Sequence, residues 1–210
     1  MSTRRSPIAA VLSATSASAG PAEKCVAVSH PSDMVKIGVK GSELDRWAAE
    51  NGIDLPPGVY ETRGLADRGL LARVGNNEII LECVPDSTEL SRIEQALATP
   101  RAGVYRIEQQ SATFELAGPR ARDVLAQMCS VNFQDAEPGR IIYTRLAGVS
   151  CGIIPLGREP QVTHRIWVDY TYAPYLWEML TGIFSEYIQA NQSTFSWNCS
   201  GGGITPARFD

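Results

Sequence analysis

The sequence lacks the features that mark several common classes of protein. It has only two histidines, His30 and His164, and its five cysteines are widely spaced without a C-x-x-C pair. We therefore expect neither a zinc site nor a disulfide framework. Reduced thiols are the expectation, as is usual in the cytoplasm. The sequence also has no G-x-G-x-x-G motif, so it does not predict a dinucleotide-binding Rossmann domain.

Basic charge and long apolar runs are also missing. The formal net charge is −4, and the 19 basic residues are spread along the chain, which argues against a nucleic-acid partner. No apolar run approaches the ~20 residues of a membrane-spanning helix, so no membrane partner is expected. Arg4-Arg5 followed by residues 8–12 weakly resembles a signal peptide, but the apolar part is too short, and a disordered leader is the favoured interpretation.

Nucleophiles with an adjacent base are not evident. Cys151 lies in an apolar strand-like run and Cys129 ends a predicted helix, so both are expected to be buried and unreactive. His164 begins a predicted strand and is expected to face solvent at an edge. The glycines at 201–203 are not preceded by a strand or followed by Gly-Lys-Ser, so they do not predict a phosphate-binding loop.

Alternating and helical patterns predict an α+β fold with antiparallel or mixed sheets and packed helices. Helices are expected where apolar residues recur every three or four positions, and strands where they alternate. The predicted strands are 34–40, 59–63, 70–74, 78–83, 104–108, 113–116, 141–146, 149–154 and 165–169, and the predicted helices run through 47–50, from 86 to 99, from 120 to 131 and from 172 to 188. Asp86 and Glu89 have the spacing of a capping box.

Residues 112–155 contain the most informative succession of elements. A short strand is broken by Gly118-Pro119, a helix follows, and Pro138-Gly139 leads into two strand-like runs. This order resembles the tetrahydrofolate-binding domain of the glycine-cleavage aminomethyltransferase family (T-protein). The matching positions are Gly118-Pro119, Ala121, Pro138-Gly139, Tyr143-Thr144 and Gly152-Ile153-Ile154.

The first half of the chain is similar to the small gamma subunit of heterotetrameric sarcosine oxidases, which belongs to the same superfamily. The similar segments are 34–40, the helix with Leu44 and Trp47, Ile53-Asp54-Leu55-Pro56, and the hairpin 70–82. The resemblance covers roughly residues 34–187. It implies a folate-binding-like domain over 32–190. The Ser-, Ala- and Pro-rich composition of 1–31 predicts a disordered arm, and the polar, Gly-rich composition of 191–210 predicts a tail.

The resemblance also shows a departure from the family. In aminomethyltransferases, the strand that matches Gly152-Ile153-Ile154 leads into an acidic residue that contacts the folate. Here Pro155 follows, and the nearest carboxylate is the displaced Glu159, beside Pro160. Without a carboxylate at this place no acid–base role can be assigned. We therefore expect no catalytic residue, no metal ligand and no cofactor held by this chain alone.

Aromatic residues are concentrated around the junction between the last predicted strand and the long helix. Some of them are expected in the core, and the remainder are typical of a protein–protein interface. Isolated aromatic residues in the C-terminal tail are expected to fold onto a partner. The candidate interface residues are Trp167, Tyr170, Tyr172, Tyr175, Trp177, Trp197 and Phe209.

The resemblance implies three alternative functions. The first is a non-catalytic small subunit of a flavoenzyme complex that oxidises secondary N-methyl amines such as sarcosine, N-methylglutamate or dimethylamine. Its partners would be larger flavoprotein subunits, and the complex would carry flavin, with tetrahydrofolate as a second candidate cofactor. The second is a tetrahydrofolate-binding domain that captures formaldehyde or transfers one-carbon units. The third is a free-standing scaffold protein with the same fold.

Overall fold

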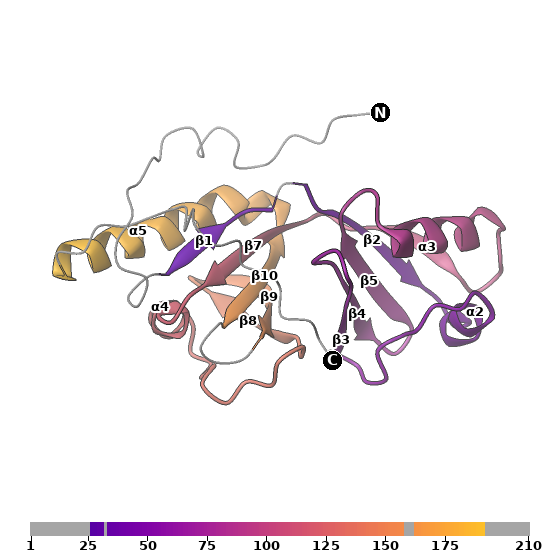
Figure 1. The fold of residues 1–210 in the computed structure, drawn as a ribbon, viewed down its shortest axis with the longest axis horizontal. Coiled ribbons are helices and arrows are strands. Elements are labelled where there is room, and N and C mark those ends of the chain that lie inside the picture. Colours follow the sequence, from indigo (N-terminus) through magenta and orange to yellow (C-terminus); the bar gives the residue numbers. More distant parts are fainter. Residues whose placement is uncertain (1–25, 32, 158–161, 192–210) are drawn as a thin grey trace. The chain divides into compact units, whose positions relative to one another are not determined.

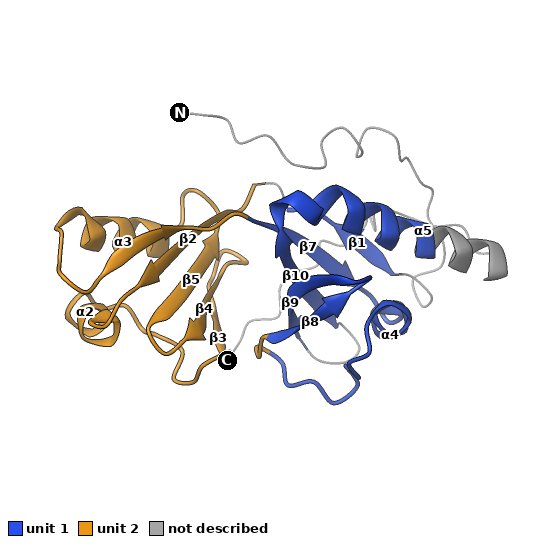
Figure 2. Cartoon of the chain, turned by 180° about the vertical axis from the view of Figure 1, so that it is seen from behind, with its two compact units in different colours: residues 1–32, 111–138, 142–206 blue, residues 33–110, 139–141, 207–210 orange. Residues whose placement is uncertain are grey.

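The computed structural model describes residues 26–31, 33–157 and 162–191, with side chains described up to residue 183 of the last helix. The chain divides into two compact units (Figure 2). The described part of unit 1 contains residues from 26–31, 111–138 and 142–191, and unit 2 contains 33–110 and 139–141. The range 32–190, assigned to one domain from the sequence, thus holds two such units.

Unit 2 is a five-stranded antiparallel sheet with two helices on one face (Figure 1). The strand order is β3-β4-β5-β2-β6. Along the chain the elements are β2 (Val35–Lys40), α2 (Leu44–Glu50), β3 (Thr62–Gly64), β4 (Leu70–Gly75), β5 (Glu78–Cys83), α3 (Thr88–Ala98) and β6 (Tyr105–Glu108).

Unit 1 has the same two-layer construction, with strand order β1-β7-β10-β9-β8. All strand pairs in the described part of both sheets are antiparallel, which confirms the α+β prediction. The elements are β1 (Ala27–Ser29), β7 (Ser111–Ala117), α4 (Ala121–Met128), β8 (Ile142–Leu146), β9 (Val149–Leu156), β10 (Thr163–Asp169), η2 (Tyr170–Tyr172) and α5 (Ala173–Asn191).

The two units repeat one topology. Each contains a strand, a helix, three consecutive strands and a second helix, and the first strand pairs with the last of the three: β2 with β5, and β7 with β10. The edge strand beside each first strand comes from the other half of the chain. β1, which precedes β2 in sequence, pairs with β7, and β6, which precedes β7, pairs with β2. The halves are therefore related by an internal repeat with reciprocally exchanged edge strands.

Alternation explains which face of each sheet carries the helices. In unit 2, Ile37 and Val39 of β2 face the buried Trp47 of α2 and Ile93 of α3. In unit 1, Phe114 of β7 and its neighbours on the same face pack against both helices. The apolar residues of that core include Leu116, Val124, Leu125, Ile153, Ile166, Val168, Leu176, Trp177 and Leu180. Each unit therefore has its own core between its sheet and its helices.

Two local predictions from the sequence were wrong. Residues 27–29 form strand β1, although the arm predicted over 1–31 was expected to be disordered; Val26 and Val28 are buried, and β1 pairs along β7. The capping box at Asp86 is also absent, because the N-cap residue of α3 is Ser87 and its side chain makes no capping bond. The Glu89 carboxylate instead accepts hydrogen bonds from arginines.

Among the described residues, no helix combines the length and apolarity needed to cross a membrane.

Candidate functional site

The strand position where the aminomethyltransferase family carries its acid belongs to β9. Pro155 occupies it, is buried, and lies opposite His164 of β10 in the sheet register. A buried proline supplies no proton donor or acceptor on its side chain. Glu159, the displaced carboxylate, lies outside the described residues. The described part of β9 therefore places no acid at the position that the family uses.

His164 does not face solvent at an edge, as the sequence had suggested. β10 is the central strand of its sheet, and His164 lies on the same face of the strand as the core residues Ile166 and Val168. Its side chain is 0% exposed, stands edge-on to the Phe133 ring at 5.6 Å between centroids, and has no hydrogen-bond partner at either ring nitrogen. Burial, assisted by the charge of Arg122, lowers the pKa of His164 to about 4. The imidazole is therefore neutral at pH 7.

Among the described residues, the helix-free face of each sheet has a cross-strand ion pair, buried in unit 2 and partly exposed at its carboxylate in unit 1. In unit 2, Lys36 Nζ of β2 lies 3.3 Å from Glu82 Oε1 of β5, and both side chains are almost fully buried. In unit 1, Arg165 Nη2 of β10 donates to Glu115 Oε1 of β7 at 2.5 Å. Both pairs join the first and last strands of the repeat. Because each carboxylate is held by a cation, these pairs are structural and offer no general base.

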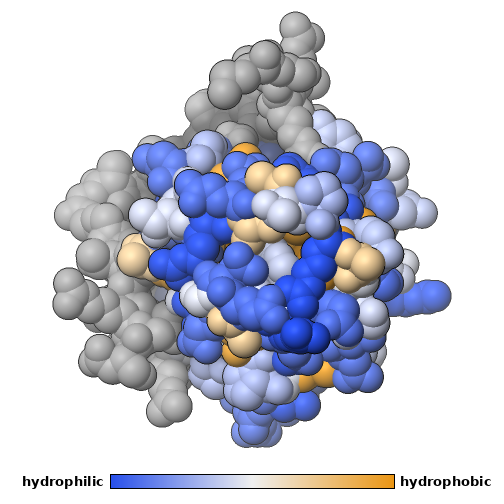
Figure 3. Space-filling view, turned by 90° about the vertical axis from the view of Figure 1, so that its right-hand side faces the viewer, coloured by the Kyte–Doolittle hydropathy of each residue, from blue (hydrophilic) through white to orange (hydrophobic). Residues whose placement is uncertain are grey.

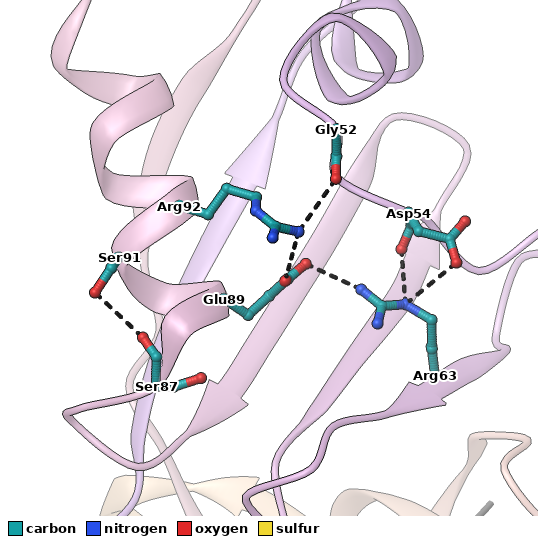
Figure 4. A network of polar contacts seen from close by, with 7 residues as sticks. All are labelled: Gly52, Asp54, Arg63, Ser87, Glu89, Ser91 and Arg92. Atoms are coloured by element: carbon teal, nitrogen blue, oxygen red, sulfur yellow. Dashed lines mark hydrogen bonds and ion pairs between the residues drawn. The ribbon is translucent and has the colours of Figure 1, made fainter.

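Glu89 anchors a second polar network in unit 2 (Figure 4). Its carboxylate accepts hydrogen bonds from Arg63 of β3 at 2.9 Å and from Arg92 of α3 at 3.3 Å. The two guanidinium groups also bind backbone carbonyls of the loop after α2, at Asp54 and Gly52. The network ties α3, β3 and that loop together. Its charges are satisfied within the unit, so it is a structural cluster.

The three described cysteines are buried, as was predicted for Cys129 and Cys151. Cys129 and Cys151 lie in the core of unit 1, and Cys129 Sγ is 3.5 Å from Thr144 Oγ1. Burial raises the pKa of the Cys151 thiol to about 12, and that of Cys83 to about 11. Thiols this far from ionisation are poor nucleophiles at pH 7. Among the described residues, no group of three or more metal-ligating side chains comes together.

The two described tryptophans among the candidate interface residues, Trp167 and Trp177, are buried. Trp177 is 2% exposed and stacks on Phe114 with 5.8 Å between ring centroids, and Trp167 is also buried. Trp177 lies with Leu176 and Leu180 on the buried side of α5, whereas Met179 is 37% exposed. The Trp177 side chain is therefore a core element and is not available to a partner. Trp197 and Phe209 lie outside the described residues.

The tyrosines of the same junction are exposed. Tyr172, the last residue of η2, and Tyr175 and Met179 of α5 are 52%, 43% and 37% exposed. Their spacing of three and four residues is that of neighbours on one side of a continuous helix. We call these three residues the α5 flank. The Tyr175 hydroxyl donates to the Ala147 carbonyl at 3.0 Å in the β8–β9 turn. Tyr170 of η2 is exposed as well.

The junction that presents the flank is locally fixed. Asp169, at the end of β10, accepts hydrogen bonds from the Thr171 hydroxyl at 2.6 Å and backbone N–H at 2.9 Å. These two hydrogen bonds hold the pKa of Asp169 below its usual value, and the one from the Thr171 hydroxyl has the larger effect. The sequence identified the tyrosines but not Met179 as a surface residue. The exposure of Met179 could have been inferred from the helical spacing. Ala173, Leu176 and Leu180 form the buried side of α5, and Met179 lies on the adjacent side.

The chain is similar in fold to a chain of the heterotetrameric sarcosine oxidase from Corynebacterium sp. U-96. The TM-score is 0.70 at 23% sequence identity, and the match covers 88% of this chain and 96% of that one. It is also similar to the glycine cleavage system aminomethyltransferase T from Bartonella henselae, with a TM-score of 0.60 at 16% identity. That match covers 77% of this chain but 46% of the other, so this chain spans about half the length of the aminomethyltransferase.

No protein-family model matches the chain, and no curated protein sequence matches it. The two structural matches establish the fold, and it is the fold that the Gly118-Pro119, Pro138-Gly139 and Gly152-Ile153-Ile154 motifs predicted.

Proposed function

We propose that this chain is a non-catalytic subunit of a hetero-oligomeric flavoenzyme that oxidises secondary N-methyl amines. The observation that carries the proposal is the fold match to a chain of a heterotetrameric sarcosine oxidase, which covers nearly all of both chains. The match spans both compact units of this chain and is not confined to one of them. The chain as a whole therefore corresponds to one component of such an assembly.

The chemistry of the described residues supports a role without catalysis. Pro155 stands where the aminomethyltransferase family has its acid, and the Glu82 and Glu115 carboxylates are each held by a cation. The Cys151 thiol is buried and protonated. We propose that the larger subunits hold the flavin, that a partner supplies any tetrahydrofolate site, and that the complex works in the cytoplasm on sarcosine, N-methylglutamate or dimethylamine.

The test is purification of the full chain, tagged in its native host, under gentle conditions. The expected result is a native mass well above the 22.8 kDa of the chain, with flavin absorbance that is bleached by one of the three amines. A colourless species near the mass of the chain would contradict the proposal. The bleaching amine would identify the substrate class.

The similarity to aminomethyltransferase T supports one alternative, a tetrahydrofolate-binding domain that captures formaldehyde. The isolated full chain should then bind tetrahydrofolate stoichiometrically with micromolar affinity in a calorimetric titration. The absence of an acid at Pro155 favours the first proposal over this one.

A further inference from the structure

The repeated topology provides an internal comparison between the last helices of the two units. α3 follows β5 in unit 2, and α5 follows β10 in unit 1, so the two helices hold equivalent places. Each packs one stripe against its own sheet. Because the fold imposes the same burial on both, a difference between their outer sides is not a requirement of the fold.

The outer side of α3 is charged and satisfied within its own unit. Arg92 pairs with Glu89 along the helix, and Glu94 pairs with Arg106 of β6. Figure 3 shows that the side of the molecule which carries α2 and α3 is predominantly hydrophilic. Such a surface is typical of a helix that remains in contact with water.

The outer side of α5 is different. Among its described side chains, Ala173 to Ile183, Glu178 is the one charged residue, and it lies beside Met179. The α5 flank exposes on the order of 300 Å² of tyrosine and methionine surface, taking ~200 Å² for each free side chain. A contiguous patch of ~300–600 Å² is the largest that a typical monomer exposes, and such patches often serve binding.

The flank is also preorganised for contact. The hydrogen bond from Tyr175 to Ala147 fixes one ring against the β8–β9 turn, in which Ala147 and Gly148 both have positive φ values of 49° and 83°. A ring already fixed in position loses little conformational entropy when a partner covers it. Tyrosine supplies a large contact area with few rotatable bonds, and it is enriched among the residues that dominate binding energy.

We propose that the α5 flank, formed by Tyr172, Tyr175 and Met179, is the centre of the surface on which a flavin-carrying subunit docks, with a basic side chain of that subunit opposite Glu178. This inference rests on the proposed function. The flank supplies less than half of the ~800 Å² that a stable interface buries on each partner, so the interface must also take in surface of this chain around the flank, as docking of a larger subunit would. A membrane surface is disfavoured, because the described side chains of α5 include no Lys or Arg and Glu178 repels anionic headgroups.

The test compares variants of the tagged full chain purified from the native host. Tyr172→Asp/Met179→Asp places two charges on the flank, and Gln95→Asp places a charge on the exposed side of the equivalent helix α3 as the matched control. We expect the flank variant to reduce the flavin copurified per chain at least tenfold and the control to leave it unchanged. Thermal melting of each purified chain verifies that both variants fold as the wild type does.

The outcomes separate the two proposals. If the wild-type chain copurifies with flavin and the flank variant does so equally well, the docking surface is wrong while the proposed function stands. If the wild-type chain carries no flavin, both fail. A wild-type homodimer that the flank variant dissociates would overturn the assignment to a flavin-carrying partner. Glu178→Lys should also lower the amount of copurified flavin several-fold. An unchanged amount would refute the proposal that a basic side chain of the partner lies opposite Glu178.

Discussion

Replacing His164 by leucine should remove most of the acid sensitivity of unit 1. The His164 ring is fully buried, and both of its nitrogens lack hydrogen-bond partners among the described residues. Its pKa falls from 6.5 in the unfolded chain to about 4 in the folded protein. Between these values the unfolded chain binds a proton that the folded chain excludes, so the free energy of unfolding decreases as the pH falls from 6.5 toward 4.

The magnitude follows from the two pKa values. Lowering the pH from 7 to 5 should cost the wild-type protein about 2 kcal/mol through His164 alone, and the full shift corresponds to about 3 kcal/mol. Most carboxylates remain ionised down to pH 5, so this window isolates the histidine. At pH 7, leucine should be neutral or stabilising, because it removes two polar atoms that are buried without partners.

Urea unfolding followed by tryptophan fluorescence at pH 7, 6 and 5 measures the effect. Both chains should carry His30→Gln, so that His164 is the one histidine that titrates. Between pH 7 and pH 5, the free energy of unfolding should fall by about 2 kcal/mol more in the chain that retains His164 than in the His164→Leu chain. Equal losses in the two chains would refute the reasoning, because they would show that His164 is solvated or hydrogen-bonded.

Three further changes test the packing. Lys36→Met should lower the free energy of unfolding by about 3–5 kcal/mol, because it removes the ammonium group 3.3 Å from the buried Glu82 carboxylate, and adding Glu82→Leu should restore most of the loss in chemical denaturation. Gly41→Ala should prevent stable folding of unit 2, seen as loss of a cooperative thermal transition, because φ is 150° and a Cβ would lie 1.9 Å from the Gly103 carbonyl oxygen. Trp177→Ala should cost about 3–5 kcal/mol by opening a cavity in the core of unit 1, and a melting temperature within 2 °C of the wild type would contradict its core position.

The sequence by itself determined most of the secondary structure. Alternation at residues 34–40 and the turn at Asn76-Asn77 predicted β2 and the β4–β5 hairpin, because a strand with one buried face has a period of two and a hairpin needs a tight turn. The motifs from Gly118-Pro119 to Ile154 predicted the fold, and the proline after Ile154 predicted a site without the family's acid. These features depend on near neighbours in the chain.

Only the tertiary structure decided which residues are buried and which elements pair. His164 was expected at an edge, but its strand lies between β7 and β9, and pairing on both sides is not encoded in the strand's own residues. The exchange of β1 and β6 between the halves joins segments far apart in sequence. Trp177 and Tyr175 are both aromatic and two positions apart, yet one fills the core and the other faces solvent, because the sheet beneath α5 fixes the helix rotation.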